Sequence, residues 1–549
     1  MQMTCKVCGT KYSLSEGETK NYAKFGYDPP PLCFACTQKQ RVCFRNGRTL
    51  YRRKCDFSGE TIVSMYAPDS PYTIYKQDIW WSDQWDPLTY GKEYDFNRPF
   101  FEQFKELSLQ SPHSTLTNIN PDNSEYCNMC EGNRNCYLTI GGDFNEDCLY
   151  GNFNMHNRDV VDCDTSNDNE ACFFILNSFD CYGCQFTFDS KNCSDCSFVS
   201  DCMGCSDCIL CTNQRNKSFC ILNEQLTKEE FAQRKSDLMN GTYSMQQKNW
   251  EEFLKLLSKR AVKATHNVSC EDCAGDYIKG SKNCVNCFDA SDCEDCMNMI
   301  FLSKTKDSFN SGFIGDTSEL CYNMQAAIAY GSTHSFTVFE SKFIEYSEHI
   351  FHSEYMFGCS NVKKKKYCIL NTQYSEKEYK DLRVKIIEHM KSTGEWGQYF
   401  PRSFSCFGYN ESTASEIFPM SKKEAMGQGF NWRDEEDIKL DVEKVIPASD
   451  LPDSIEDIPD DILNWAIRCE KTNKPFKLIN QELKFYRTHR IPVPHIHPDE
   501  RYRIRLSLKN PSVLWDRTCA KCEKAVRTSY APERPEIVYC EECYLKEVY

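Results

Sequence analysis

The sequence contains no long apolar run. No stretch of its 549 residues approaches the roughly 18 consecutive apolar residues of a membrane-spanning helix. The N-terminal segment MQMTCKVCGTKYSLSEGETK lacks the apolar core and the small-residue cleavage site of a secretory signal. The motifs G-x-S-x-G, G-x-G-x-x-G, H-E-x-x-H and the P-loop are also missing. We therefore expect a cytoplasmic protein that does not contact a membrane, and the missing motifs favour a binding protein over an enzyme.

Positive charge is in the minority. The chain has 65 Lys and Arg against 80 Asp and Glu, a net charge of -15, which argues against a protein that coats nucleic acid with its whole surface. The charge is also sorted along the chain. Residues 122–224 hold 17 acidic and 5 basic residues, whereas residues 1–60 hold 11 basic and 5 acidic, and residues 465–549 hold 17 basic and 11 acidic. Any contact with nucleic acid is therefore expected at the two ends.

Cysteine, by contrast, is abundant, with 36 residues. In the reducing compartment that we expect, thiols bind metals or pack as small apolar groups more often than they form disulfides. Each end of the chain has two Cys pairs with a two-residue gap, a spacing that directs both sulfurs of a pair at one point. Each double pair predicts one structural Zn²⁺ ion with no open coordination position. The eight predicted ligands are Cys5, Cys8, Cys33, Cys36, Cys519, Cys522, Cys540 and Cys543.

The two ends are copies of one unit. Residues 5–75 align without a gap on residues 469–539 at an offset of 464, so each end holds two ribbon-like modules in tandem. Only one module of each tandem keeps four cysteines. The ligand positions of the other two modules are Cys55, Ser58, Lys76 and Ile79 at the N-terminal end, and Cys469, Thr472, His497 and Glu500 at the C-terminal end. We expect both to be held by packing, with a mixed Cys-His-Glu site as the alternative for the second, where His495 is also near.

The terminal modules resemble probable zinc-ribbon domains of the treble-clef-like kind found in many bacterial proteins. The matching residues are Cys5-x2-Cys8-Gly, Tyr12, Leu14, Tyr22, the proline run before Cys33-x2-Cys36, and Arg41. The whole chain resembles an uncharacterised family of large Cys-rich proteins of candidate-phylum bacteria. The segments that carry this resemblance are YTIYKQDIWWSDQWDPLTYG, RPFFEQF, NSEYC, FPMSKKEAMGQGFNW, DDILNWAIRC and RPEIVYCEECY. The resemblance implies an architecture and no activity.

The middle of the chain has a period of twelve residues. Cysteines recur at this step with one interruption, at Val160, and a large apolar residue usually follows two positions later. Residues two positions apart lie on the same face of a β-strand, so the cysteine and the apolar residue that follows it indicate a strand. The Asn, Asp, Gly and Ser between steps are typical of tight turns. The pattern predicts a parallel β-solenoid with a rung of one step or two, and the bulky Phe column favours two. The cysteines of the series are Cys136, Cys148, Cys172, Cys184, Cys196, Cys208 and Cys220.

A second solenoid repeats the first at an offset of 148, which places Cys136 on Cys284 and Cys220 on Cys368. Cys148 also falls on Cys296. At the five steps from Val160 to Cys208 the second copy carries other residues, namely Ser308, Leu320, Ser332, Ile344 and Met356. Ile and Met fit a packed interior better than a row of ligands, so we expect the ladder cysteines to be buried core thiols. A metal or iron–sulfur site within the dense run 193–211, and disulfides, are the alternatives.

A helix is predicted directly after each solenoid. Thr227 with Glu230, and Ser375 with Glu378, have the spacing of a capping box. We expect these helices to cover the unpaired edge of the last rung.

Arginines cluster beside the Cys pairs at both ends and are the candidate phosphate-binding residues. They are Arg41, Arg45, Arg48, Arg52, Arg53, Arg501, Arg503 and Arg505. The alternative, a solvated face or ion pairs with the acidic solenoid, is favoured. The aromatic group Trp80, Trp81, Trp85 and Tyr90 could stack bases, but a hydrophobic seam between domains is the favoured interpretation. The pair His349 and His352 is interpreted as structural.

The sequence thus predicts a multidomain, mainly β protein. Two related parallel β-solenoid modules with capping helices are flanked at both termini by tandem zinc-ribbon or treble-clef-like modules. The predicted segments are 1–85 and 465–549 for the tandems, 86–121 for a connector, 122–224 and 266–372 for the solenoids, 225–265 for capping helices, and 373–464 for a helix and an acidic, Pro-containing linker.

The predicted function is that of a zinc-binding adaptor or scaffold with two structural zinc ions, contacting RNA, DNA or a nucleoprotein complex through its basic ends. A structural protein that self-associates through its terminal tandems is one alternative. An enzyme or redox protein that uses the Cys-rich solenoid is the other.

Overall fold

The computed structural model describes residues 2–434 and 442–549. The chain divides into two compact units. Unit 1 contains Met1–Leu116, Thr265–Asp434 and Pro511–Leu514, and unit 2 contains Thr117–Ala264, Glu435–Asn510 and Trp515–Tyr549. The N-terminal tandem therefore shares a unit with the second Cys-rich segment, and most of the C-terminal tandem shares one with the first. Residues 435–441 of the predicted acidic linker lie outside the described residues.

Unit 2 is built on an eight-stranded sheet, which we call ladder 1. Consecutive strands pair in parallel, and the partner of each residue lies twelve positions further along the chain, as for Val160 with Cys172 and Thr187 with Val199. Neighbouring strands are therefore one step of the sequence period apart. Of the two predicted spacings, the one-step rung fits this register, and the favoured two-step rung is wrong. The strands are β9 (Glu146–Leu149), β10 (Arg158–Asp164), β11 (Glu170–Leu176), β12 (Gln185–Phe188), β13 (Ser197–Ser200), β14 (Ser206–Thr212), β15 (Ser218–Ile221) and the antiparallel β16 (Glu224–Gln225).

Nearly every third residue of ladder 1 has a positive φ, for example 47° at Asn177, 56° at Asp180 and 48° at Asp189. Asn and Asp tolerate this left-handed conformation better than most residues, which explains why they recur in the sequence period. The left-handed residue turns the backbone, so the simple alternation of a strand does not continue through it. The strands of ladder 1 are consequently short and are interrupted by left-handed residues at a regular spacing.

These turns separate the cysteines from the large apolar residues. Cys172, Cys184 and Cys196 belong to an interior cluster, whereas Phe186 and Phe198 belong to a second cluster with residues of α6 (Tyr243–Lys259) and of the C-terminal tandem. The prediction that each cysteine and the apolar residue two positions later face the same side is wrong, because the apolar residue lies at a left-handed turn. That backbone strain is offset by ring packing: Phe186 and Phe198 stack with centroids 4.5 Å apart.

Unit 1 is built on an eleven-stranded sheet, ladder 2, whose consecutive coils also pair in parallel. Its register is less regular, since Gly312 pairs with Gln325, thirteen residues on, and Gln325 pairs with Phe336, eleven residues on. This shift puts Cys321 rather than Leu320 into the interior. The strands are β18 (Ala274–Lys279), β19 (Val285–Ser291), β20 (Met297–Ser303), β21 (Gly312–Ile314), β22 (Gln325–Tyr330), β23 (Phe336–Glu345), β24 (Glu348–Phe351), β25 (Glu354–Phe357), β26 (Ser360–Lys363), β27 (Lys366–Ile369) and the antiparallel β28 (Thr372–Gln373).

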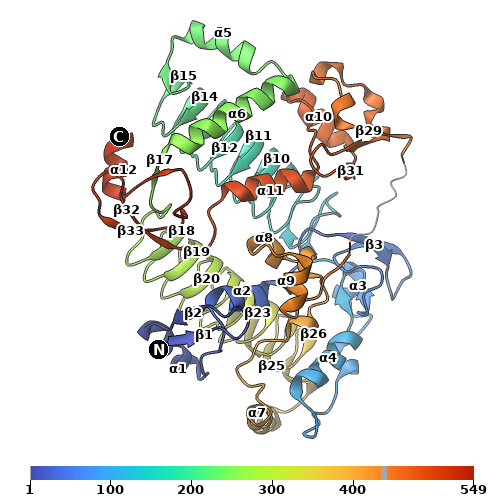
Figure 1. Ribbon diagram of the computed structural model, residues 1–549. Helices are drawn as coiled ribbons and strands as arrows, with labels where there is room; N and C mark the ends of the chain where they lie inside the picture. The colour runs from blue at the N-terminus through green and yellow to red at the C-terminus, as the bar shows by residue number, and fades with distance from the viewer. Residues whose placement is uncertain (1, 435–441) are drawn as a thin grey trace. The chain divides into compact units, whose positions relative to one another are not determined.

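The two predicted capping boxes are confirmed. Thr227 and Glu230 start α5 (Lys228–Leu238), and Ser375 and Glu378 start α7 (Glu376–Ser392), each with the reciprocal side-chain and backbone hydrogen bonds. Figure 1 shows α6 and α11 (Pro498–Leu508) lying across the strands of ladder 1. Within the described residues, no helix is both long and apolar enough to cross a membrane.

The terminal tandems keep their common architecture at the offset of 464. The hairpin β3 (Tyr51–Lys54) and β4 (Thr61–Ser64) coincides residue for residue with β32 (Trp515–Thr518) and β33 (Ala525–Thr528). The other N-terminal elements are β1 (Gln2–Thr4), β2 (Lys11–Ser13), α1 (Glu16–Phe25), α2 (Phe34–Val42) and α3 (Gln77–Trp81). Their C-terminal counterparts are β30 (Trp465–Arg468), β31 (Pro475–Phe476), α10 (Asn480–Thr488), α11 and α12 (Glu541–Val548).

Both tandems also use equivalent positions to contact the ladder of their own unit. In unit 1, Asn298 Nδ2 donates to Glu18 Oε1 at 2.8 Å; in unit 2, Tyr150 OH donates to Glu482 Oε2 at 2.9 Å. Glu18 and Glu482 differ by 464 in residue number, and Tyr150 and Asn298 differ by 148. The two repeats of the sequence are therefore one compound unit, a tandem on a ladder, present twice.

Candidate metal centres

The first candidate centre is formed by Cys5, Cys8, Cys33 and Cys36. The first pair follows β1 in the turn of the β1–β2 hairpin, and Cys33 is the N-cap of α2. All four sulfurs lie within 4.8 Å of one another, and Cys8 Sγ is 3.7 Å from Cys33 Sγ. The structure thus brings together the four ligands predicted from their spacing.

The second candidate centre repeats this geometry with Cys519, Cys522, Cys540 and Cys543. The first pair follows β32 in its hairpin turn, and Cys540 is the N-cap of α12. The four sulfurs again lie within 4.8 Å, with 3.7 Å between Cys522 Sγ and Cys540 Sγ. Each centre is closed by four protein ligands, which is compatible with a structural zinc ion and leaves no position for a substrate.

Local hydrogen bonds favour thiolates at both centres. A hydrogen bond from the Cys36 side chain is the largest influence on Cys33 and lowers its pKa to about 6, against the opposing effect of burial. At Cys519, burial raises the pKa, but the backbone N–H groups of Cys540, Lys521 and Cys522 outweigh it and lower the pKa to about 6. The pKa of Cys36 is raised instead, chiefly by its hydrogen bond to Cys33, and the pKa of Cys543 is raised chiefly by burial. The shifts therefore favour a thiolate at each centre, and the thiolate is the form of cysteine that binds metals.

The two degenerate modules keep the hairpin turn without a full ligand set. Cys55 Sγ accepts backbone N–H groups from Ser58 at 3.4 Å and Lys76 at 3.2 Å, so its thiol is held by the turn itself. In the C-terminal tandem, His497 Nδ1 accepts the N–H of Asp499 and caps α11, while Glu500 pairs with Lys471 at 3.3 Å.

The alternative mixed site is consequently not assembled. Among the described residues, Cys469, Thr472, His497 and Glu500 do not bring three metal-binding atoms within 4.8 Å of one another. His495 Nδ1 lies 2.6 Å from Glu470 Oε1 instead.

The ladder cysteines are buried, except the half-buried Cys270 and Cys273, and many donate to backbone carbonyls. Cys172 Sγ donates to Glu170 O at 3.2 Å, and Cys196 Sγ donates to Ser194 O at 3.3 Å. Burial raises the pKa of Cys163 and Cys359 well above the usual range for a thiol. In the part of the chain that the structure describes, no ladder cysteine belongs to a group of three metal-binding atoms within 4.8 Å, and every cysteine is free. These features are those of neutral thiols in an apolar core.

The arginines beside the Cys pairs are mostly turned inward. Arg41, Arg45, Arg53, Arg501 and Arg505 are buried, Arg48 is half-buried, and Arg52 and Arg503 are exposed. Arg505 Nη1 lies 2.8 Å from Asp162 Oδ1, and Arg501 Nε lies 2.6 Å from Asp162 Oδ2. The C-terminal arginines therefore form ion pairs with ladder 1, which was the favoured alternative.

The N-terminal arginines are also engaged within their unit. Arg41 Nη1 donates to Asn323 Oδ1 at 2.8 Å, and Arg53 Nη2 pairs with Asp56 at 3.0 Å. The guanidinium of Arg45 lies over the ring of Phe313, 4.6 Å from its centroid. The eight arginines therefore do not form one continuous basic surface.

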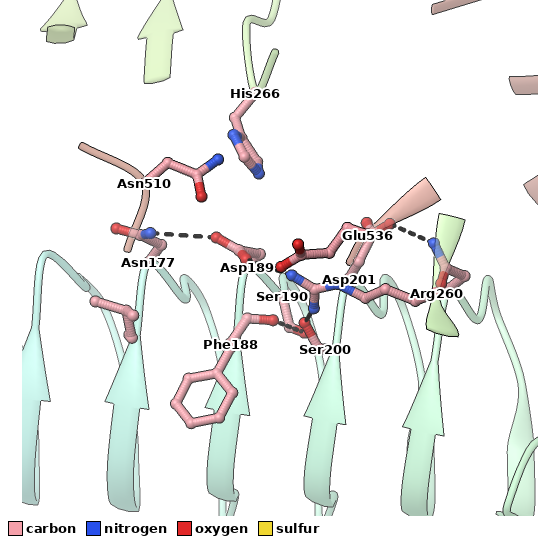
Figure 2. A network of polar contacts seen from close by, with 12 residues as sticks. Asn177, Phe188, Asp189, Ser190, Ser200, Asp201, Arg260, His266, Asn510 and Glu536 are labelled. Carbon is pink, nitrogen blue, oxygen red and sulfur yellow. Dashed lines mark hydrogen bonds and ion pairs between the residues drawn. The ribbon is translucent and has the colours of Figure 1, made fainter. Parts of the chain in front are cut away.

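A further arginine, Arg260, binds an acidic column that the sequence pattern did not single out (Figure 2). Asn177, Asp189 and Asp201 occupy left-handed turn positions twelve residues apart. Asn177 Nδ2 donates to Asp189 Oδ1 at 3.2 Å, and Arg260 lies 3.8 Å from Asp189 and donates to Ser200 Oγ. The signal that could have found this column is the recurrence of Asn and Asp at the ladder period. Part of the acidity of ladder 1 is thus neutralised within unit 2.

The tryptophan group forms an apolar cluster with ladder 2. Trp80 is fully buried, its Nε1 donates to Pro112 O at 2.8 Å, and its ring lies 5.4 Å from that of Phe351. Trp85 Nε1 donates to Trp80 O at 2.8 Å. These contacts are those of the hydrophobic seam that was favoured over base stacking.

His349 and His352 do not act as a pair. His352 Nδ1 lies 2.9 Å from Glu340 at the surface, whereas His349 gathers with His113 and Glu348 in a third group of metal-binding atoms within 4.8 Å. No sequence pattern predicts this group, because His113 precedes the other two residues by more than 230 positions.

Comparisons with known proteins yield a weak structural similarity and no family. No protein-family model matches the chain, and no curated protein matches it. Among solved structures, the chain is similar to the crystal structure of a "putative acetyltransferase" from Desulfovibrio desulfuricans G20, with 10% identity and a TM-score of 0.09. The match covers 37% of this chain and 62% of the other. A similarity this weak carries no argument about fold or function.

Proposed function

We propose that this chain is a zinc-dependent scaffold of a reducing, cytoplasmic compartment. In this proposal the two ladders are β-solenoids, and the terminal modules are zinc ribbons of the treble-clef-like kind. One Zn²⁺ ion in each intact module stabilises the conformation in which the tandem packs against its solenoid. The observation that carries the proposal is the pair of closed four-thiol centres, each built from a hairpin turn and a helix N-terminus.

The buried charges of the tandems support a scaffold over a protein that binds nucleic acid through the predicted arginines. Arg501 and Arg505 are 3% and 0% exposed, and both pair with the buried Asp162. Glu482 also pairs with Arg501, and Asp164 with Arg505. A phosphate backbone could reach them only if unit 2 opened. The uncharacterised family that the chain resembles fits the same proposal, since large repeats with zinc-bound ends suit binding better than chemistry.

Site-directed removal of one ligand tests the zinc part of the proposal. Cys36→Ser and Cys543→Ser should each lower the zinc content by one ion per chain, measured by mass spectrometry of the purified protein. Limited proteolysis should then cut the affected tandem faster. Cys55→Ser is the matched control, because its thiol lies in a degenerate module and accepts backbone N–H groups of Ser58 and Lys76. Unchanged zinc in both ligand variants would overturn the assignment.

Affinity purification from the native cell, with and without nuclease, tests the scaffold part. Protein partners that are retained after nuclease treatment support a protein scaffold. Partners that disappear with nuclease would instead favour the adaptor for RNA, DNA or a nucleoprotein complex. A self-associated chain with no partner would favour assembly through the terminal tandems.

A further inference from the structure

Unit 1 contains a buried group of two histidines and one glutamate, outside both four-thiol centres. His113 comes from β6 (His113–Ser114), and Glu348 and His349 come from β24 of ladder 2. The three side chains are buried, and one metal-binding atom from each lies within 4.8 Å of the other two. The rings of His113 and His349 meet edge to face, with centroids 5.2 Å apart.

The orientation of His113 leaves an electron pair directed into this group. Its Nδ1 lies 2.9 Å from Ser111 O, and a carbonyl can only accept, so Nδ1 carries the proton and donates. In the neutral ring, Nε2 is then an acceptor. Asn361 Nδ2 donates to it at 3.2 Å, and Glu348 Oε1 lies 3.6 Å from it. A ring nitrogen fixed in this way by a backbone carbonyl is typical of histidines that bind metals.

The Glu348 carboxylate is buried beside the ring of His113, and its metal-binding oxygen lies within 4.8 Å of a ring nitrogen of each histidine. Ser360 Oγ also donates to Glu348 Oε1 at 2.8 Å. Two acceptor groups, the Glu348 carboxylate and the Nε2 atom of a neutral His113, thus lie beside each other in a buried space, an arrangement that attracts a cation.

Asn361 supplies a second, independent sign of a missing ligand. This residue of β26 is fully buried, and its Oδ1 has no hydrogen-bond partner among the described residues. Its Nδ2 donates to Ser360 Oγ at 2.9 Å and lies 3.2 Å from His113 Nε2, so the amide is part of the same group. A buried carbonyl oxygen without a partner is costly, and rotation of the amide would direct it toward a cation at the site.

We propose that His113, Glu348 and His349 bind a divalent transition-metal ion of the zinc and iron(II) class, with Asn361 Oδ1 as the available fourth donor. Two imidazoles and one carboxylate are a ligand set that both Zn²⁺ and Fe²⁺ accept. Bonds of about 2.0–2.1 Å at tetrahedral angles require ligand separations of about 3.3 Å. The 3.6 Å between His113 Nε2 and Glu348 Oε1 is close to this value. The ligand atoms that lie further apart, up to 4.8 Å, would move together when the metal binds.

A proton in place of the metal is the competing explanation. A protonated His113 would pair with Glu348 at 3.6 Å, which is long for a hydrogen bond, and the rotated Asn361 amide would accept its Nε2 proton. The metal content of the chain distinguishes this arrangement from a metal site. The cationic side chain nearby, Lys105, donates instead to Tyr72 OH at 2.5 Å and to Phe404 O at 3.1 Å. A metal ion satisfies Nε2, the carboxylate and the orphan carbonyl together.

Metal content of the full chain tests the proposal. The protein is incubated with Zn²⁺ or, under anaerobic conditions, Fe²⁺, and is then freed of loose metal and analysed by mass spectrometry. Three ions per chain are expected, and Glu348→Gln should lose one of them while keeping the two in the thiol centres. His352→Gln is the matched control, because it removes a neighbouring surface histidine that pairs with Glu340. Two ions per chain in the wild type, or a third ion that survives Glu348→Gln, would overturn the proposal.

X-ray absorption at the zinc edge tests the third site in the wild-type chain, so it does not depend on whether Glu348→Gln folds. The wild-type, zinc-loaded chain should show nitrogen and oxygen ligands in addition to the sulfur shell of the two thiol centres. A sulfur-only shell would reject the third site without any variant. Since the thiol centres and this site have different ligands, the proposed zinc scaffold and the third site can fail separately.

Discussion

Replacement of Arg505 by methionine tests whether the terminal arginines hold unit 2 together. The guanidinium is 0% exposed and lies against Asp162 and Asp164, which are 0% and 1% exposed, and over the ring of Phe174. Methionine keeps most of the volume but leaves the carboxylates with less countercharge. Removing one partner of a buried ion pair destabilises a protein by about 3–5 kcal/mol. For a unit of this size, with a urea m-value of about 2–3 kcal/mol/M, the midpoint should fall by about 1–2 M.

The matched control is Arg503→Met, two residues away on the same helix. Its side chain is 57% exposed and pairs with Glu500, so about 0–1 kcal/mol is expected. Urea unfolding is followed by hydrogen exchange at the amides of ladder 1, which separates unit 2 from unit 1. Equal effects of the two replacements would refute the internal role of Arg505. A loss of nucleic-acid affinity in the Arg505 variant with unchanged stability would restore the phosphate-binding hypothesis.

Three further predictions concern the ladders and their caps. Cys196→Ala should destabilise unit 2 by about 1 kcal/mol and Cys196→Val by less, because the site is a packed interior position. Thermal unfolding measures both changes, and a larger loss of stability with Val than with Ala would contradict the core role. Burial lowers the pKa of His334 to about 3, so the unfolded chain binds a proton that the folded chain refuses between its ordinary pKa near 6.5 and pH 3. Stability should therefore fall as pH drops through this window, and His334→Phe should flatten the pH profile of unit 1; an unchanged profile would count against it. Thr227→Ala should destabilise the start of α5 by about 1 kcal/mol, because Thr227 Oγ1 accepts the N–H of Glu230. The amides of the first turn should then exchange hydrogen faster than in the wild type. Equal exchange rates in the variant and the wild type would exclude a capping role.

Much of the local structure was predictable from residue spacing. The two-residue gaps of the Cys pairs, the capping box at Thr227 and the gap-free offset of 464 all correspond to features of the structure. The twelve-residue period was also correct as a period, and it appears as the strand register. Each of these signals lies within a few residues or repeats regularly, so it does not depend on how distant segments pack.

The direction of side chains within a coil was not predictable in the same way. Phe186 and Phe198 follow Cys184 and Cys196 by two positions, and the simple strand rule places each pair on one side. Left-handed turns at 186 and 198 separate them, so the cysteines fill the interior and the phenylalanines contact α6. A bulky residue at positive φ is unusual, and sequence gives no reason to expect it without the packing that offsets the strain.

The sequence by itself determined the two four-thiol centres, the helix starts and the duplication of both designs, because these depend on covalent spacing and short-range hydrogen bonds. Only the tertiary structure decided that Arg505 is buried against Asp162 and that His113 meets Glu348 and His349. It alone also placed the N-terminal tandem in the unit of ladder 2 and most of the C-terminal tandem in the unit of ladder 1. Those contacts join residues more than 200 positions apart, where the free energy of burying a charge or an aromatic ring depends on which surfaces meet, and no pattern along the chain encodes that choice.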